Sequence, residues 1–125
     1  MIVFDSNMII YAADPRYGSL RRLIEEGECV VSAISKVEVL GYHKIEPEEV
    51  VIFNEFFRFM KQIPVTDEVL DKAVALRQQK NTSVCDAVIG ATALLFGAEL
   101  YTRNTKDFTL IPGLRIVNPL DEETS

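Results

Sequence analysis

Short apolar segments alternate along this chain with longer stretches in which apolar residues recur at helical spacing. Strands are predicted for the short segments, at residues 2–4, 29–32, 63–65, 99–102 and 115–117. Strands that alternate with helices in this way form parallel βαβ units. Because the strand segments are apolar almost throughout, both faces of the sheet need a cover of helices. The pattern therefore predicts an α/β fold, a three-layer α/β/α sandwich with a mostly parallel central sheet.

Helices are predicted between these strands, at residues 7–13, 17–26, 35–45, 47–61, 67–80 and 84–96. Local signals support several of these bounds. Pro47 suits a first helical turn, where its missing N–H is harmless. Thr66, followed by two acids, is typical of a helix N-terminus. Gly97 suits the position that follows a helix C-terminus.

The composition indicates one globular domain. Of 125 residues, 48% are hydrophobic and 26% charged, which excludes intrinsic disorder. We expect a domain at 1–120 and an acidic tail at 121–125. The net charge of −6 excludes nonspecific binding of polyanions through overall charge.

The two cysteines and the lack of targeting signals point to one compartment. Cys29 and Cys85 form no C-x-x-C pair, so neither a zinc site nor a disulfide framework is indicated. No apolar run approaches the roughly 20 residues that a bilayer needs, and no basic segment opens the chain. We therefore expect a cytoplasmic protein that does not contact a membrane.

Four acids are predicted at the edge of the sheet where ligands gather, the carboxyl ends of the strands. Asp5 follows the first strand, and Asp107 lies in the loop after the fourth. Glu38 and Asp86 are expected in the first turns of two helices. Carboxylates that converge repel one another and need a cation. Oxygen ligands select Mg²⁺ or Mn²⁺, which can activate water and steady a leaving oxygen, so the pattern indicates hydrolytic phosphoryl transfer.

Each acid also has an interpretation without catalysis. Ser35-x-x-Glu38 and Ser83-x-x-Asp86 are both similar to capping boxes, in which the acid reaches back to the N-cap residue. Asp5 is placed to cap the helix that follows it, and Asp107 suits an ordinary loop. These interpretations do not explain why four acids share one edge.

The chain resembles the PIN-domain ribonucleases and, among them, the VapC-type toxins of toxin–antitoxin modules. The motifs that match are Phe4-Asp5-Ser6-Asn7, Ser35-x-x-Glu38-Val39-Leu40, Asp86-Ala87-x-Ile89-Gly90-Ala91-Thr92-Ala93, Thr102-Arg103-Asn104-x-x-Asp107-Phe108, Ile111-Pro112-Gly113-Leu114 and Asn118-Pro119. No single motif is specific, but together they cover almost the whole chain in order. Ser6 stands where threonine is common in the family, and Gly90 where alanine is common.

The resemblance implies a catalytic, metal-binding centre made of four carboxylates, Asp5, Glu38, Asp86 and Asp107. Asp5 and Asp86 would be its principal ligands. Hydrogen-bond support for the centre is implied from Asn7, Thr102 and Asn104, and contacts with RNA phosphates from Arg103 and Lys106.

The function that the resemblance implies is Mg²⁺- or Mn²⁺-dependent endoribonuclease activity, with water attacking the RNA phosphodiester to leave 5′-phosphate and 3′-hydroxyl ends. Such proteins are homodimers, and a small antitoxin covers their acidic groove while its other end binds operator DNA. The sequence does not identify the RNA that is cleaved.

Two other functions fit part of the pattern. The chain could be a PIN-fold partner that acts mainly as a noncatalytic corepressor with its antitoxin, although all four acids are present. A two-component receiver domain has similar length and an aspartate site for Mg²⁺, with Asp67 as the candidate phosphoacceptor. Receivers resemble a strict alternation of strand and helix, whereas two helices are predicted here between the second and third strands.

Three further features are expected to be structural. His43, the only histidine, suits a surface or core position rather than a general base. A dense apolar face at 53–60 suits the core. Because it is broader than one helix stripe, its remaining apolar residues suit a protein interface. A small basic cluster of Arg16, Arg21 and Arg22 is expected to be a solvated face, with a phosphate contact as the alternative.

Overall fold

In the computed structural model, residues 1–120 are described, and the predicted acidic tail lies outside the described residues. One parallel sheet of five strands forms the centre, in the order β3-β2-β1-β4-β5. The strands are β1 (Ile2–Phe4), β2 (Val30–Ser32), β3 (Lys61–Ile63), β4 (Glu99–Tyr101) and β5 (Arg115–Val117). The predicted parallel α/β/α architecture is confirmed.

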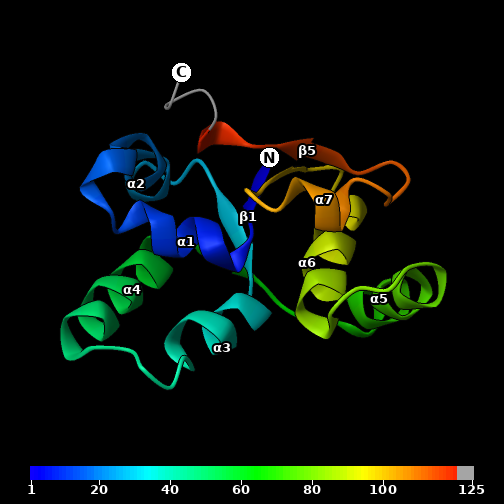
Figure 1. Cartoon of the computed structure of the whole chain (residues 1–125), viewed down its shortest axis with the longest axis horizontal. Coiled ribbons are helices and arrows are strands. Elements are labelled where there is room, and N and C mark those ends of the chain that lie inside the picture. The colour runs from blue at the N-terminus through cyan, green and yellow to red at the C-terminus, as the bar shows by residue number, and fades with distance from the viewer. Residues whose placement is uncertain (121–125) are drawn as a thin grey trace.

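Helices cover both faces of the sheet (Figure 1). They are α1 (Ser6–Ala12), the 3₁₀ helix η1 (Pro15–Tyr17), α2 (Gly18–Glu25), α3 (Ile34–Leu40), α4 (Pro47–Phe59), α5 (Asp67–Gln79), α6 (Val84–Leu95) and α7 (Thr105–Phe108). Alternate strand residues point to opposite faces. Phe4 accordingly packs into one apolar core with α1, α2 and α4, while Val3 packs into a second core with α5 and α6.

The strand order reverses beside β1, because β2 pairs on one side of it and β4 on the other. Open parallel sheets bind ligands at such a switch point, at the carboxyl ends of the strands. The order 3-2-1-4-5 differs from the 2-1-3-4-5 order of receiver domains. The receiver interpretation is therefore wrong.

Two predicted element bounds are wrong for physical reasons. Helix α3 ends at Leu40 rather than at residue 45, and a Cβ on Gly41 would lie 2.2 Å from the carbonyl oxygen of Val37, so the close turn requires glycine. Strand β3 covers 61–63 rather than 63–65. It is an edge strand, where the polar Lys61 and Gln62 are tolerated, and Pro64 lacks the N–H to extend the ladder.

Several local predictions are confirmed. Pro47 lies in the first turn of α4, and the Thr66 hydroxyl accepts a hydrogen bond from Val69 N at the start of α5. Gly97 follows α6 with a φ of 61°. Within residues 1–120, no helix has both the length and the apolar character needed to span a membrane.

Candidate active site

Asp5 follows β1 directly and is only 4% exposed. Its Oδ1 accepts a hydrogen bond from Met8 N (2.9 Å), which caps α1, and its Oδ2 accepts one from the Thr102 hydroxyl after β4 (2.6 Å). The Asp5 N–H donates to the carbonyl of Tyr101 in β4 (3.2 Å). The capping interpretation is thus correct for Asp5, and the same carboxylate also joins two neighbouring strand ends.

Burial raises the pKa of the Asp5 carboxyl from its usual 3.8 to about 6. The hydrogen bonds from Thr102 and Met8 lower this pKa, because they favour the charged form, while the charges of Asp86 and Glu38 raise it. Asp5 therefore lies within electrostatic reach of two further acids of the predicted centre. A cation bound among them would relieve this repulsion.

Glu38 is held by a hydroxyl of α1. The Ser6 hydroxyl donates to Glu38 Oε1 (2.6 Å), and Ser6 Oγ also hydrogen-bonds Ser35 Oγ (2.9 Å). Both serines are buried. The prediction that Glu38 lies in a first helical turn is wrong, since α3 begins at Ile34 and Glu38 is its fifth residue. The capping-box interpretation of Ser35 and Glu38 is therefore also wrong.

Asp86 lies in the first turn of α6, as predicted, and its N–H donates to the Ser83 hydroxyl (3.1 Å). Helix α6 leads to β4, so it runs opposite to the strands and begins at their carboxyl edge. Burial raises the pKa of Asp86, as do the charges of Asp107 and Glu38. The Ser83 hydrogen bond and the charge of Lys80 lower it.

Asp107 lies on the short helix α7, where the sequence predicts a loop. Lys80, which follows the last residue of α5, binds the backbone of α7. Its Nζ donates to the carbonyl oxygens of Lys106 and Asp107. Lys80 thus fixes the backbone that carries Asp107 and places a positive charge beside Asp86.

Grouped by the charges that act on one another, the four predicted acids form two groups, and Asp86 and Glu38 belong to both. The charges of Asp86 and Glu38 both act on Asp5, while those of Glu38 and Asp107 act on Asp86. Within residues 1–120, no three acidic, histidine or cysteine side chains lie close enough to form a ready-made metal cage. Mg²⁺ needs only one or two carboxylates because it keeps several waters. An all-oxygen donor set with repelling charges therefore fits Mg²⁺ or Mn²⁺.

The supporting residues differ in their contacts. The Thr102 hydroxyl donates to Asp5 and accepts from Asn104 N (3.0 Å), so the loop after β4 is tied to the acid. Asn7 is exposed in the first turn of α1. Its supporting role stays a prediction.

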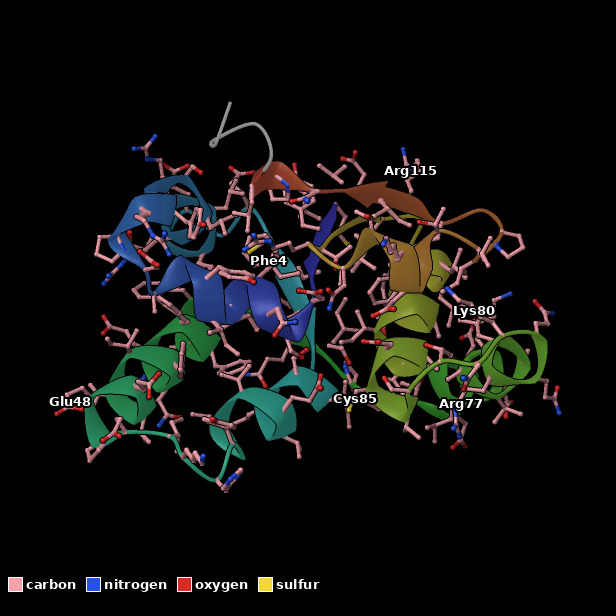
Figure 2. All side chains as sticks on the ribbon, viewed as in Figure 1. Phe4, Glu48, Arg77, Lys80, Cys85 and Arg115 are labelled. Atoms are coloured by element: carbon pink, nitrogen blue, oxygen red, sulfur yellow. The ribbon has the colours of Figure 1, made fainter. Side chains whose placement is uncertain are left out.

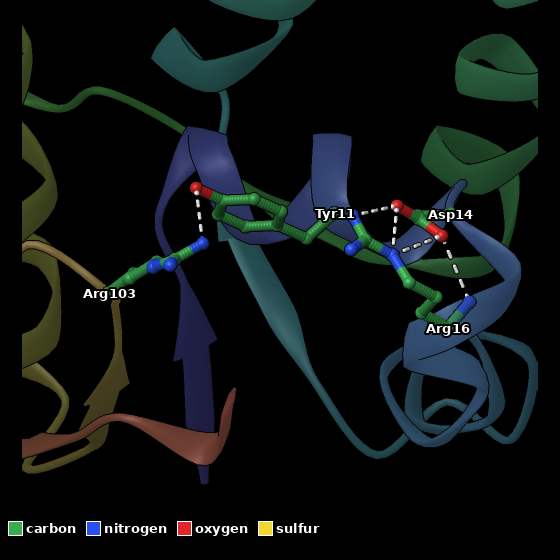
Figure 3. A network of polar contacts seen from close by, with 4 residues as sticks. All are labelled: Tyr11, Asp14, Arg16 and Arg103. Carbon is green, nitrogen blue, oxygen red and sulfur yellow. Dashed lines mark hydrogen bonds and ion pairs between the residues drawn. The ribbon is translucent and has the colours of Figure 1, made fainter. Parts of the chain in front are cut away.

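The two predicted phosphate contacts are exposed. Arg103 Nη1 donates to the Tyr11 hydroxyl (3.3 Å), and its guanidinium lies 5.4 Å from the centroid of the same ring (Figure 3). Arg103 therefore connects the loop after β4 to α1. The Lys106 carbonyl accepts a hydrogen bond from Lys80. That Arg103 and Lys106 contact RNA stays a prediction.

His43, the basic cluster and the apolar face at 53–60 are placed as follows. His43 is an exposed residue beside Tyr42, beyond the end of α3. Arg16 forms an ion pair with Asp14 (2.8 Å), as Figure 3 shows, and Arg21 lies 3.7 Å from Glu25. In the helix at 47–59, Phe53, Phe56 and Phe57 are buried, while Phe59 is exposed.

The sequence does not predict the contacts of three polar residues around the acids, Ser6, Ser35 and Lys80. Ser6 directly follows the first acid, and the pattern around Ser35 favours a helix cap. Lys80 comes from the end of the helix that precedes Asp86. A cation six residues before a predicted metal ligand is the one signal that the sequence offers for it.

Several known structures share this architecture. A chain of a toxin–antitoxin complex from Klebsiella pneumoniae is 30% identical, with a TM-score of 0.76 over 95% of this chain and 98% of that one. VapBC2 from Rickettsia felis, bound to a DNA fragment from its promoter, is 23% identical, with a TM-score of 0.78 over 94% and 98%. FitAcB from Neisseria gonorrhoeae is 24% identical, with a TM-score of 0.75 over 96% and 99%. A comparison with curated protein sequences gave no match.

The Rickettsia and Neisseria structures, at 23% and 24% identity, are similar to this chain in fold. The sequence profile of the PIN domain matches residues 2–114, which is nearly the whole described chain. This match and the 30% identity with the Klebsiella chain show a shared family as well as a shared fold. The chain belongs to the PIN-domain family, whose members are generally nucleases.

Proposed function

We propose that this protein is a Mg²⁺- or Mn²⁺-dependent endoribonuclease that acts as the toxin of a toxin–antitoxin pair. The observation that carries the proposal is the buried Asp5 carboxylate, whose pKa is raised to about 6 while Asp86 and Glu38 act on it. This charge concentration lies at the switch point of the sheet, where ligands bind in such folds. Neighbouring carboxylates that repel one another destabilise the folded protein unless a bound cation compensates their charge.

In this proposal, Asp5, Asp86, Glu38 and Asp107 would hold the metal. A bound divalent ion would supply Lewis-acid chemistry, polarising the phosphodiester and lowering the pKa of water. Thr102 fixes the Asp5 carboxylate through its 2.6 Å hydrogen bond, and Ser6 fixes Glu38 through a bond of the same length. Lys80 holds the backbone of Asp107. Each of these three residues would reduce the reorganisation that the acids need before reaction.

We further infer a small antitoxin that binds operator DNA, a homodimeric toxin and a cytoplasmic location. The support for the antitoxin is that the similar structures are toxin–antitoxin complexes, one of them bound to promoter DNA.

The test compares the wild-type protein with Asp5→Asn and Asp86→Asn. We expect the wild type to cleave single-stranded RNA with Mg²⁺ or Mn²⁺, to lose activity with EDTA, and to leave 5′-phosphate ends. Each variant should lose cleavage by at least a hundredfold. Asp71→Asn, which changes an exposed carboxylate on α5, is the matched control. Equal cleavage by the wild type and both site variants would exclude the proposal.

The noncatalytic corepressor is the second candidate, and the DNA-bound Rickettsia structure is the observation that favours it. It predicts that Asp5→Asn and Asp86→Asn leave growth inhibition unchanged on expression without antitoxin. The nuclease proposal predicts that both substitutions abolish growth inhibition.

A further inference from the structure

A polar cavity of about 420 Å³ lies beside the acids, where α5 ends and α6 begins. It is lined by Arg77, Asn81, Thr82, Ser83, Asp86 and Asp107. We propose that Arg77 and the turn at 81–83 form a subsite for an RNA backbone phosphate, next to the phosphodiester that is cleaved. This inference rests on the proposed ribonuclease function, and it adds the path of the RNA chain beyond the acids.

The guanidinium of Arg77 is held in place while its terminal amino groups stay available for a phosphate. Its Nε donates to the main-chain carbonyl of Thr82 (3.1 Å), which fixes the guanidinium on the turn. Among the hydrogen bonds and ion pairs of residues 1–120, none uses its two terminal amino groups. A planar guanidinium with free amino groups matches the oxygens of a phosphate in a bidentate manner. Figure 2 shows Arg77 on α5 and Lys80 just after its last residue, beside α6.

The charges around the cavity favour a phosphate at Arg77. The phosphates of an RNA that approaches the four carboxylates are repelled by them. A bound metal ion offsets this repulsion only for the phosphate beside the ion. A neighbouring phosphate therefore needs a cation from the protein. Lys80 already donates to two carbonyl oxygens, and Arg103 contacts Tyr11. Arg77 lines the same cavity as Asp86 and Asp107.

Thr82 supplies a second, independent observation. Its hydroxyl oxygen is buried and has no hydrogen-bond partner among the described residues, although the residue lines the cavity. A buried hydroxyl without a partner is destabilising. A phosphate oxygen held by Arg77 would accept a hydrogen bond from this hydroxyl. The same small region thus combines an uncommitted guanidinium with an unpaired hydroxyl.

The experiment measures binding of a fluorescently labelled single-stranded RNA in the Asp5→Asn background, which prevents cleavage during titration. Arg77→Gln should weaken binding about tenfold. It should also reduce the slope of log Kd against log salt concentration by about 0.7, the value for one phosphate contact on a single strand. Arg77→Lys should keep most of that slope, because the charge remains.

The matched control is Arg115→Gln. Arg115 is also exposed and also donates to a main-chain carbonyl, that of Gly97 (2.7 Å), but it lies on the edge strand β5. We expect its affinity and salt slope to equal those of the background protein. Thermal unfolding of all variants measures any loosening of the turn at 81–83.

The possible results distinguish a phosphate subsite from a purely structural role of Arg77. If Arg77 only holds the turn, Arg77→Gln and Arg77→Lys will lose similar affinity while both keep the salt slope of the background protein, which overturns the inference. Unchanged binding in Arg77→Gln also overturns it, while RNA cleavage by the wild type leaves the proposed function standing. If the wild type neither binds nor cleaves RNA, the proposed function fails first and the subsite fails with it.

Discussion

The Thr102 hydroxyl donates a 2.6 Å hydrogen bond to Asp5 Oδ2, joining two residues 97 positions apart in the chain. This bond lowers the pKa of Asp5 against the larger effect of burial. The ionisation of the central acid therefore depends on a residue from the neighbouring strand end.

Replacing Thr102 by valine removes this bond at nearly constant volume. We expect the pKa of Asp5 to rise further, so that the pH dependence of RNA cleavage moves to higher pH. The free energy of unfolding should fall by about 1–3 kcal/mol, as for other buried hydrogen bonds to charged groups. The control is Thr92→Val, because Thr92 is equally buried but donates to Val88 within α6. An unchanged pH profile in Thr102→Val would show that the bond does not tune Asp5.

Asp5 should make the protein less stable as the pH rises. Its pKa is about 6 in the folded protein and near 3.8 when unfolded, so the folded state holds its proton more tightly. This contribution is complete below pH 4 and is lost as the pH rises through 6, by about 3 kcal/mol for a shift of this size. Asp5→Asn should therefore be more stable than the wild type at pH 7 but not at pH 4.

Urea unfolding at the two pH values, with EDTA present, measures this difference. Asp71→Asn serves again as the exposed control on α5. Added Mg²⁺ at pH 7 should raise the stability of the wild type and not that of Asp5→Asn. Parallel pH curves for the wild type and Asp5→Asn would contradict the prediction.

Ser6 should matter for catalysis through Glu38. Ser6→Ala removes the hydroxyl that donates to Glu38 Oε1, and we expect single-turnover RNA cleavage to slow about tenfold, which corresponds to about 1.4 kcal/mol. Ser6→Thr keeps the hydroxyl and should restore the rate. Ser19→Ala, at an exposed serine of α2, should have no effect. If Ser6→Thr is as slow as Ser6→Ala, side-chain volume rather than the hydrogen bond accounts for the loss.

Gly41 should be required for the end of α3. A Cβ there would lie 2.2 Å from the Val37 carbonyl oxygen, so Gly41→Ala should lower the free energy of unfolding by about 1–3 kcal/mol. Gly18→Ala meets no atom within 4 Å and lies in a helical conformation, so it should be neutral or stabilising by up to about 1 kcal/mol. Urea unfolding of the two variants checks the contrast, and equal stabilities would contradict it.

The sequence predicts the sheet and the edge that bears the acids, because apolar strands and the acids after them are local patterns. It does not predict where α3 ends, since the close approach of Gly41 to Val37 exists only in the folded turn. Strand β3 lies two residues earlier than predicted because Lys61 and Gln62 are polar, which only an edge position permits. The four residues of α7 are too few for a periodic pattern.

The contacts of the acids are harder to predict than their positions. Ser6 and Glu38 are 32 residues apart, and Lys80 reaches Asp107 across 27. Such pairs are distant in the sequence and depend on how α1, α3, α5 and α7 pack around the sheet. The functional roles of Asn7, Arg103 and Lys106 stay predictions for the same reason.

The long separation between Asp5 and Thr102 has a consequence for how the protein is made. Residues are added from the N-terminus, so Asp5 leaves the ribosome long before Thr102, Asp107 and the strand β4 that pairs with β1. Until then, Asp5 lacks the hydroxyl that orients it, and β1 lacks its β4 neighbour. A partly synthesised chain that stops before β4 and α7 therefore carries no complete acidic centre, and the centre assembles only after these elements have been made.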